Sequence, residues 1–126
     1  MDILVLDLET TVERIEGRID NSPKNPRNKC VSGYWGWLGD DTVDHVKKAV
    51  WYHKDYNGCD PTDELRADLL SADMMLCHNT KFDAEWLLEM GFTLPPLVFD
   101  TMIVEYLLAK GQRRPLSLKE SAIRRK

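Results

Sequence analysis

Apolar residues along the chain form short runs, which are separated by acidic and turn-forming positions. Residues 3–6 are continuously apolar and lead into acidic positions, a pattern typical of a central strand buried on both faces. Residues 31–38 and 42–52 are rich in Val, Tyr and Trp and flank a Gly-Asp-Asp turn, which predicts two or three antiparallel strands. The segment 17–30 contains Pro and Asn and is expected to be a loop.

The second half of the chain alternates between helical and strand patterns. Asp60 and Pro61 predict the N-cap and first residue of a helix whose buried stripe is Leu65, Leu69 and Leu70. The further predicted elements are a strand at 73–78, a helix from Asn79 or Thr80 to Met90 with Gly91 as its stop, a strand at 97–99, a helix from Asp100 to near Gly111, and a capping box at Ser117–Glu120 that opens a last helix.

This order of elements predicts an α/β fold with a five-stranded mixed sheet flanked by helices. The length of 126 residues favours one domain, residues 1–126, with a single core. The last helix has only residues 118–126, and a lone helix of fewer than about 12 residues is marginal in water. We therefore expect this helix to continue in a longer protein.

The charge is unevenly distributed. The whole chain carries a formal −4, but residues 110–126 hold seven basic residues and one acid, so residues 1–109 are strongly acidic. An acidic body argues against a non-specific nucleic-acid clamp and is compatible with carboxylates that bind cations. The apolar runs are too short to cross a membrane, and the first lacks the basic leader of a signal peptide. The cysteines Cys30, Cys59 and Cys77 lack CxxC spacing, which favours reduced thiols in a cytosolic setting.

Two acids follow the first predicted strand. Asp7 and Glu9 are two residues apart, so on a strand they share one face at its carboxyl end, where open α/β sheets bind ligands. At about 5 Å and an effective dielectric of about 20, two such charges repel by roughly 3 kcal/mol. The pair therefore needs a proton or a cation, and oxygen ligands select hard ions such as Mg²⁺ or Mn²⁺. The alternative is two solvated acids at a strand end.

A second acidic position follows the strand at 73–78. His78 ends that strand, Asn79 lies at the turn, and Asp83 lies one turn into the next helix. If this strand runs parallel to the first, Asp83 reaches the same edge of the sheet as the acids at 7 and 9. The alternatives are that Asp83 complements the helix dipole and that Asn79 is simply an N-cap.

Three blocks in this order, residues 7–10 (Asp-Leu-Glu-Thr), 78–83 (His-Asn-Thr-Lys-Phe-Asp) and 99–101 (Phe-Asp-Thr), resemble the DnaQ-like (DEDD) 3′–5′ exonuclease family. The chain looks most like the proofreading domains of phage and bacterial family-A DNA polymerases. The first two blocks are similar to the family's first motif and to its Asn-x-x-Phe-Asp second motif. The resemblance covers nearly the whole chain and implies a ribonuclease-H-like fold.

One part of the family pattern has no counterpart. The family's third motif, Tyr-x-x-x-Asp or His-x-x-x-x-Asp on a later helix, does not occur in residues 1–126, so the chain corresponds to an exonuclease domain that is incomplete at its C-terminus, with the C-terminal helices missing. Asp100 does not replace the missing acid, because the matching family position is usually not a metal ligand. We interpret Asp100 as a helix cap near the site.

The resemblance implies hydrolysis with two Mg²⁺ or Mn²⁺ ions in the complete site. Asp7 would bridge both ions, Glu9 would hold one of them, and Asp83 would hold the other; these three are the expected catalytic and metal-binding residues. Because the fourth acid and the Tyr or His that orients water are absent, we expect weak binding of the second ion and slow cleavage by this chain alone.

The implied substrate is a frayed or single-stranded 3′ end of DNA. The resemblance points to Thr10, His78, Asn79 and Phe82 near the terminal nucleotide, although Phe82 also suits the core. It implies the remainder of a DNA polymerase as partner, no membrane, and the cytoplasm of a bacterial or phage-infected cell. The basic residues of 110–126 suit either the phosphate backbone or a solvated helix face.

Three other functions fit part of the sequence. Residues 7–11 and 39–44 also look like acidic motifs of haloacid-dehalogenase-type phosphatases, but the second set comes too early and the 78–83 block stays unexplained. A non-catalytic piece of a split or truncated polymerase, binding nucleic acid or serving a structural role, fits the missing third motif. A related 3′–5′ exoribonuclease fits the same motifs, since none of them reads the 2′-hydroxyl.

Overall fold

The computed structural model describes residues 1–40, 45–51 and 62–125. The predicted helix start at Asp60 and Pro61, and parts of the strands predicted over 42–52, lie outside these residues. The described elements are β1 (Ile3–Thr10), β2 (Glu13–Ile15), β3 (Arg18–Asp20), β4 (Cys30–Trp37), β5 (Lys47–Val50), α1 (Thr62–Ser71), β6 (Met74–Cys77), α2 (Thr80–Glu89), β7 (Leu97–Asp100), α3 (Thr101–Leu108) and α4 (Leu118–Arg124).

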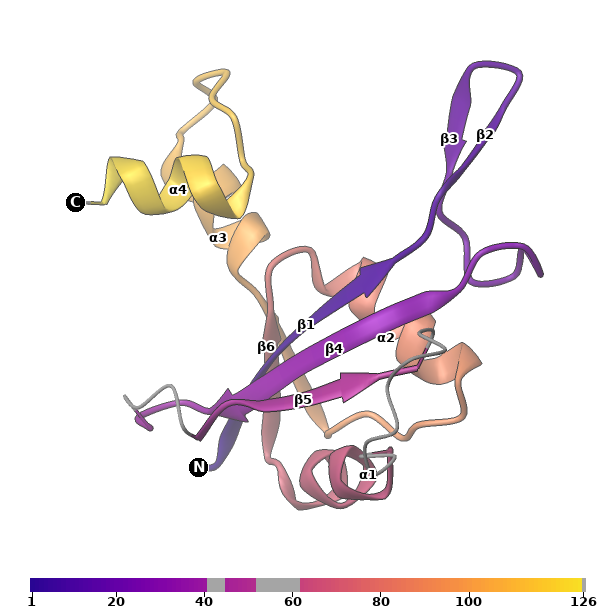
Figure 1. The fold of residues 1–126 in the computed structure, drawn as a ribbon. Helices are drawn as coiled ribbons and strands as arrows, with labels where there is room; N and C mark the ends of the chain where they lie inside the picture. Colours follow the sequence, from indigo (N-terminus) through magenta and orange to yellow (C-terminus); the bar gives the residue numbers. More distant parts are fainter. Residues whose placement is uncertain (41–44, 52–61, 126) are drawn as a thin grey trace.

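The predicted five-stranded mixed sheet is confirmed. Its strand order is β5-β4-β1-β6-β7, with β1 at the centre (Figure 1). β1 pairs antiparallel with β4 and parallel with β6, while β7 continues the parallel half. The apolar run of β1 thus occupies the middle of the sheet, and its acidic end reaches the edge where the parallel strands finish.

The sequence predicted a loop over residues 17–30, but the structure shows that part of this segment is a strand. It contains β3, which pairs with β2 in a two-stranded ribbon that projects beyond the end of β1 (Figure 1). Glu16 and Gly17 form the turn of this ribbon, and both have positive φ (49° and 79°), the combination that joins two strands by a tight two-residue hairpin turn. The proline and asparagine residues after the ribbon dominate the composition of this segment. The composition therefore predicted a loop and did not indicate the two short strands.

The core lies on one face of the sheet. Leu4, Leu6 and Leu8 alternate along β1 and are buried against apolar side chains of α1 and α2. Leu65 and Leu69 of α1 are buried there as predicted, whereas Leu70 is 64% exposed and does not belong to the stripe. The remaining large buried side chains of this core are Trp35, Met75, Trp86 and Leu87.

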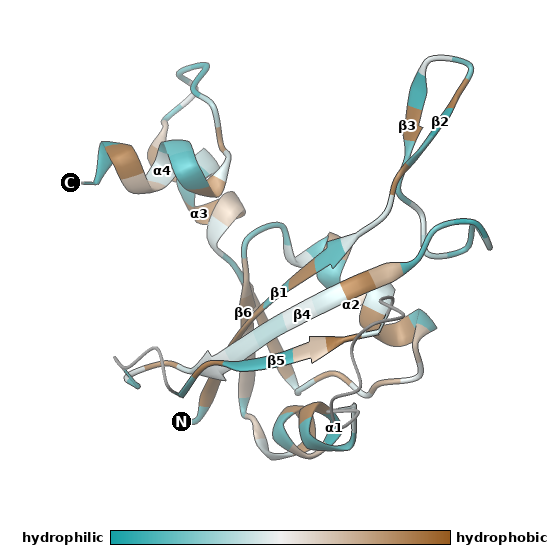
Figure 2. Cartoon of the chain, in the orientation of Figure 1, coloured by the Kyte–Doolittle hydropathy of each residue, from teal (hydrophilic) through white to brown (hydrophobic). Residues whose placement is uncertain are grey.

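The opposite face of the sheet is open near its centre. Asp7 and Tyr34 are exposed on this face, and α3 has no buried residue although its sequence is mostly apolar. In Figure 2 β6 is brown and β4 is mostly pale, while α4 and the β2–β3 ribbon carry teal stretches. Within the described residues, no helix is long and apolar enough to span a bilayer. The sheet therefore has a closed apolar face and an open face that carries the acidic end of β1.

Candidate active site

Asp7 and Glu9 lie at the end of β1, on the face opposite to Leu8. The alternation that buries Leu4, Leu6 and Leu8 leaves both acids exposed on the open face. Pairing between β1 and β6 ends at Val5, so the acidic end of β1 extends past its parallel neighbour. The two carboxylates therefore emerge side by side at the rim of the sheet, as the sequence predicted.

Asp83 is directed at this same rim. It comes from the first turn of α2 and is only 2% exposed, and its Oδ1 accepts a hydrogen bond from the backbone N–H of Leu8 at 3.1 Å. Leu8 lies between Asp7 and Glu9 in the sequence. The hydrogen bond therefore holds Asp83 beside these two acids, although Asp83 is 75 residues from Leu8 along the chain. The carboxylate satisfies an N–H of β1 beyond the last pairing with β6.

Burial is the main influence on the ionisation of Asp83 and Asp7. Burial raises the pKa of Asp83 to about 7; the Leu8 N–H opposes this shift, and the nearby Asp7 carboxylate adds to it. Burial also raises the pKa of Asp7, opposed by the electrostatic effect of His78. A cation at this rim would stabilise the ionised form of both acids.

The donor set suits a hard cation. Asp7, Glu9 and Asp83 offer only carboxylate oxygens, the ligands that Mg²⁺ and Mn²⁺ prefer. Among the residues that the structure describes, no group of three or more His, Cys, Asp and Glu side chains is already gathered around one metal position. Asp7, Glu9 and Asp83 are therefore the residues that could hold a divalent ion at this rim.

Asp100 caps two helices, which supports its interpretation as a cap near the site. Its Oδ1 accepts from the N–H groups of Asn79 and Met102, both at 2.9 Å, and its Oδ2 accepts from the Thr80 N–H at 2.9 Å. The predicted cap of α2 by Asn79 or Thr80 is wrong in its chemistry. Asn79 is the N-cap residue, with left-handed backbone, but its side chain makes no capping bond, and the acceptor comes from the end of β7 instead.

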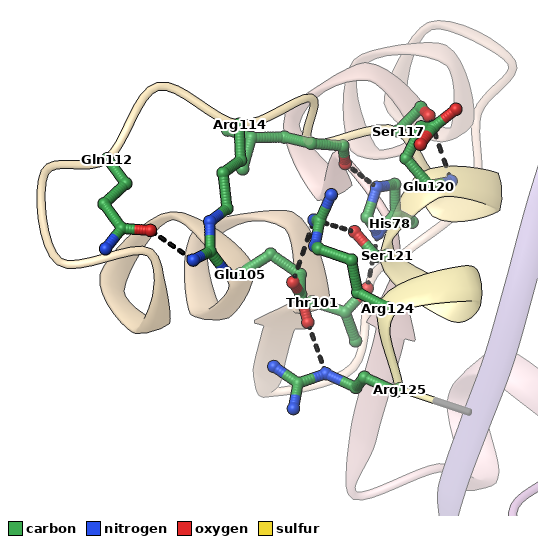
Figure 3. A network of polar contacts seen from close by, with 11 residues as sticks. His78, Thr101, Glu105, Gln112, Arg114, Ser117, Glu120, Ser121, Arg124 and Arg125 are labelled. Carbon is green, nitrogen blue, oxygen red and sulfur yellow. Dashed lines mark hydrogen bonds and ion pairs between the residues drawn. The ribbon is translucent and has the colours of Figure 1, made fainter.

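His78 joins the end of β6 to the segment before α4. Its Nε2 donates to the backbone carbonyl of Leu116 at 2.6 Å, and since a carbonyl only accepts, Nε2 carries a proton. Its Nδ1 lies 2.9 Å from the hydroxyl of Thr101, at the start of α3 (Figure 3). The ring is thus held from both sides by bonds within the chain, and its charge influences the nearby Asp7.

The other residues expected near a nucleotide are placed differently. Thr10 ends β1 opposite Cys30 and is half-buried. Asn79 is exposed at the turn before α2. Phe82 is partly buried and packs against the core, so little of its ring is available for stacking on a base. Of this predicted set, Asn79 is exposed, while Thr10, His78 and Phe82 are half-buried.

The basic C-terminal segment is partly neutralised within the chain. Arg125 and Arg124 contact the Glu105 carboxylate at 2.7 and 3.3 Å, which fastens α4 to α3 (Figure 3). The Arg125 guanidinium is the main cause of the lowered pKa of Glu105, and Arg124 adds to it. These two arginines therefore hold the helices together and are only partly available to a phosphate backbone.

Tyr34 is a candidate that the sequence interpretation did not single out. It is the register partner of Asp7 on β4 and is 39% exposed on the same face. The nearby Trp35, by contrast, is buried and donates its Nε1 proton to Asp68 of α1 at 2.8 Å. Only the strand register distinguishes the exposed tyrosine from the buried tryptophan, and the composition of this segment does not reveal it.

No protein-family model matches this chain, and a search of curated proteins found no match.

Proposed function

We propose that this chain is part of a 3′–5′ exonuclease of the proofreading type, which removes nucleotides from DNA 3′ ends by metal-dependent hydrolysis. The observation that carries the proposal is the hydrogen bond from Leu8 N–H to Asp83, because it brings the acid of the second sequence block beside the acids of the first. We further propose that the protein acts within or beside a DNA polymerase, in the cytoplasm of a bacterial or phage-infected cell.

The sheet supports a ribonuclease-H-like assignment. The strands β5, β4 and β1 pair antiparallel with one another in that order, and β6 and β7 then continue parallel to β1. The crossovers that include α1 and α2 lead into and out of β6 and place Asp83 at the rim. This arrangement is the one that the motif order implied, with the acids where parallel strands end.

Mg²⁺ or Mn²⁺, when bound, would supply positive charge against the phosphate and lower the pKa of a coordinated water. Asp7 would hold it from the open face of β1, and Asp83 from the N-terminal turn of α2, with Glu9 as a further ligand. The protonated Nε2 of His78 is engaged by Leu116, so the ring is kept in a fixed orientation beside Asp7. Three acids for up to four positive charges predict slow cleavage by this chain.

A digest of 5′-labelled single-stranded DNA with Mn²⁺ tests the proposal. The wild-type chain should release nucleotides one at a time from the 3′ end, giving a ladder of shortened products. Asp7→Ala and Asp83→Ala should abolish the ladder, because each removes a ligand of the cation. Asp63→Ala, an exposed acid in the first turn of α1, is the matched control and should cleave like wild type.

The result distinguishes hydrolysis from the non-catalytic alternative. Equal digestion by wild type and Asp7→Ala, or no digestion by wild type at high protein concentration, contradicts catalysis by these acids. Retained binding of the DNA without digestion would then favour a nucleic-acid-binding fragment of a polymerase.

A further inference from the structure

A row of polar side chains crosses the open face of the sheet at the level of Asp7. The antiparallel register pairs Asp7 with Tyr34, and Tyr34 with Lys48 on β5. On the other side, the pairing of β1 with β6 ends at Val5, and His78, which follows directly after β6, exerts an electrostatic influence on Asp7. Cross-strand partners of this kind have Cβ atoms about 5 Å apart. Tyr34 is therefore the immediate neighbour of Asp7 on the side away from His78.

A groove of about 340 Å³ lies on this side, and its lining includes Val5, Asp7, Tyr34, Gly36 and Val46. A volume above about 300 Å³ falls in the range of small-molecule sites. Gly36 leaves the floor of the groove bare, because it has no side chain over the sheet. A Cβ placed there would meet no atom nearer than 3.8 Å, so the bare floor is not forced by crowding.

Asp7 also lines a second cavity, of about 420 Å³, on the other side. That cavity is bounded by His78, Phe99, Leu118 and Arg125 among others. Asp7 thus lies on the boundary between two hollows of the same face. A phosphodiester has one nucleoside on each side of its phosphate, and a phosphate held at Asp7 would direct its two nucleosides toward these two hollows.

We propose that the groove beside Tyr34 binds one base of single-stranded DNA. This base belongs to the nucleotide next to the phosphate that is held at Asp7. This inference rests on the proposed function and names the part of its substrate that the groove takes. The Tyr34 ring is 39% exposed, and the Lys48 ammonium lies 5.5 Å from its centre. An aromatic surface with a cation beside it suits a base and the adjoining backbone, and such stacking is tolerant of sequence.

Binding of a fluorescein-labelled dT4 oligonucleotide, followed by anisotropy in EDTA so that no cleavage occurs, tests the groove. Tyr34→Ala should weaken binding by about 5- to 100-fold, the usual range for loss of one stacked base. Tyr34→Phe keeps the ring and should bind within about twofold of wild type. Gly36→Val should weaken binding by a similar factor to Tyr34→Ala, because its side chain fills the floor while a Cβ there has room.

Tyr106→Ala is the matched control. Tyr106 is 64% exposed on α3 and does not line the groove, so its removal should leave dT4 binding unchanged. The thermal unfolding temperature of each variant, measured alongside, shows whether lost binding reflects lost folding. Equal binding by wild type, Tyr34→Ala and folded Gly36→Val overturns the inference, and so does the absence of dT4 binding by wild type.

The binding assay and the digest can fail separately. If no nucleotides are released but dT4 binding still depends on Tyr34 and Gly36, the groove stands as a binding site and the exonuclease proposal fails. If digestion depends on Asp7 but wild type and Tyr34→Ala bind dT4 equally well, the exonuclease proposal stands. The assignment of the groove as a base-binding site is then wrong.

Discussion

Replacing Asp83 by Asn should remove most of the pH dependence of stability that the buried Asp83 carboxyl contributes. Asp83 is almost fully buried, and its amide counterpart keeps the size of the side chain and an oxygen that can accept from Leu8 N–H. The substitution therefore changes the ability to ionise more than it changes packing. In the wild type, raising the pH forces a negative charge into this buried position, and in the variant it does not.

The magnitude follows from the pKa. Burial raises the pKa of Asp83 from 3.8 to about 7, so the folded state binds the proton more tightly than the unfolded chain. The resulting stabilisation is fully present below about pH 4 and is lost as the pH rises through 7. A difference of about 3 pKa units corresponds to about 4 kcal/mol, of which roughly 2–3 kcal/mol is lost between pH 5 and pH 8.

Urea unfolding in EDTA at pH 5 and pH 8 measures this effect. The free energy of unfolding of the wild type should fall by about 2–3 kcal/mol more than that of Asp83→Asn over this interval. Other groups, Asp7 included, titrate in both proteins and largely cancel in the comparison. Equal pH dependence of the two proteins would refute the reasoning, because it would mean that Asp83 is ionised in the fold at no cost.

Three further outcomes are expected. Gly33→Ala should cost about 1–3 kcal/mol in urea unfolding, because its Cβ would lie 2.9 Å from Leu8 Cδ2, whereas Gly36→Ala should change stability by less than about 0.5 kcal/mol; equal effects would contradict this packing. Asp100→Ala should cost about 2–4 kcal/mol by thermal unfolding, since it leaves three N–H groups without their acceptor, and a neutral result would exclude the double cap. Millimolar Mg²⁺ at pH 8 should raise the unfolding temperature of wild type but not of Asp7→Ala; an equal rise in both would place the ion elsewhere.

The parts of the fold predicted from sequence are those set by local patterns. The apolar run of β1 predicted a central strand, and its central place in the sheet is confirmed. The predicted burial on both faces is wrong, because Leu4 and Leu6 are buried while Ile3 and Val5 are only half-buried. The acids after the run marked its carboxyl end. Asp83 could be placed at the same edge because parallel strands end together and helices begin there. Ser117 likewise accepts from the Glu120 N–H, at 3.4 Å, as the capping box predicted.

The parts that sequence missed depend on contacts between distant residues. The cap of α2 comes from Asp100, which lies 21 residues beyond Asn79, and a local reading of Asn79 and Thr80 has no means of finding it. Leu70 fits a helical stripe by spacing, yet only Leu65 and Leu69 face the core, because the angle at which α1 meets the sheet decides which positions are covered. The β2–β3 ribbon was missed because each of its strands has only three residues.

The division of the sheet into two faces connects the acidic rim with the groove. Leu4, Leu6 and Leu8 use one face of β1 for the core, so strand alternation sends Asp7 to the other face. The same rule, applied to β4, buries Trp35 and exposes Tyr34. Burying the leucines and the tryptophan thus forces the acid and the tyrosine onto one open surface, next to each other. A one-residue slip of β4 against β1 would exchange the two aromatic side chains and leave Asp7 beside a different neighbour. The register that stabilises the core is therefore the same register that assembles the candidate site.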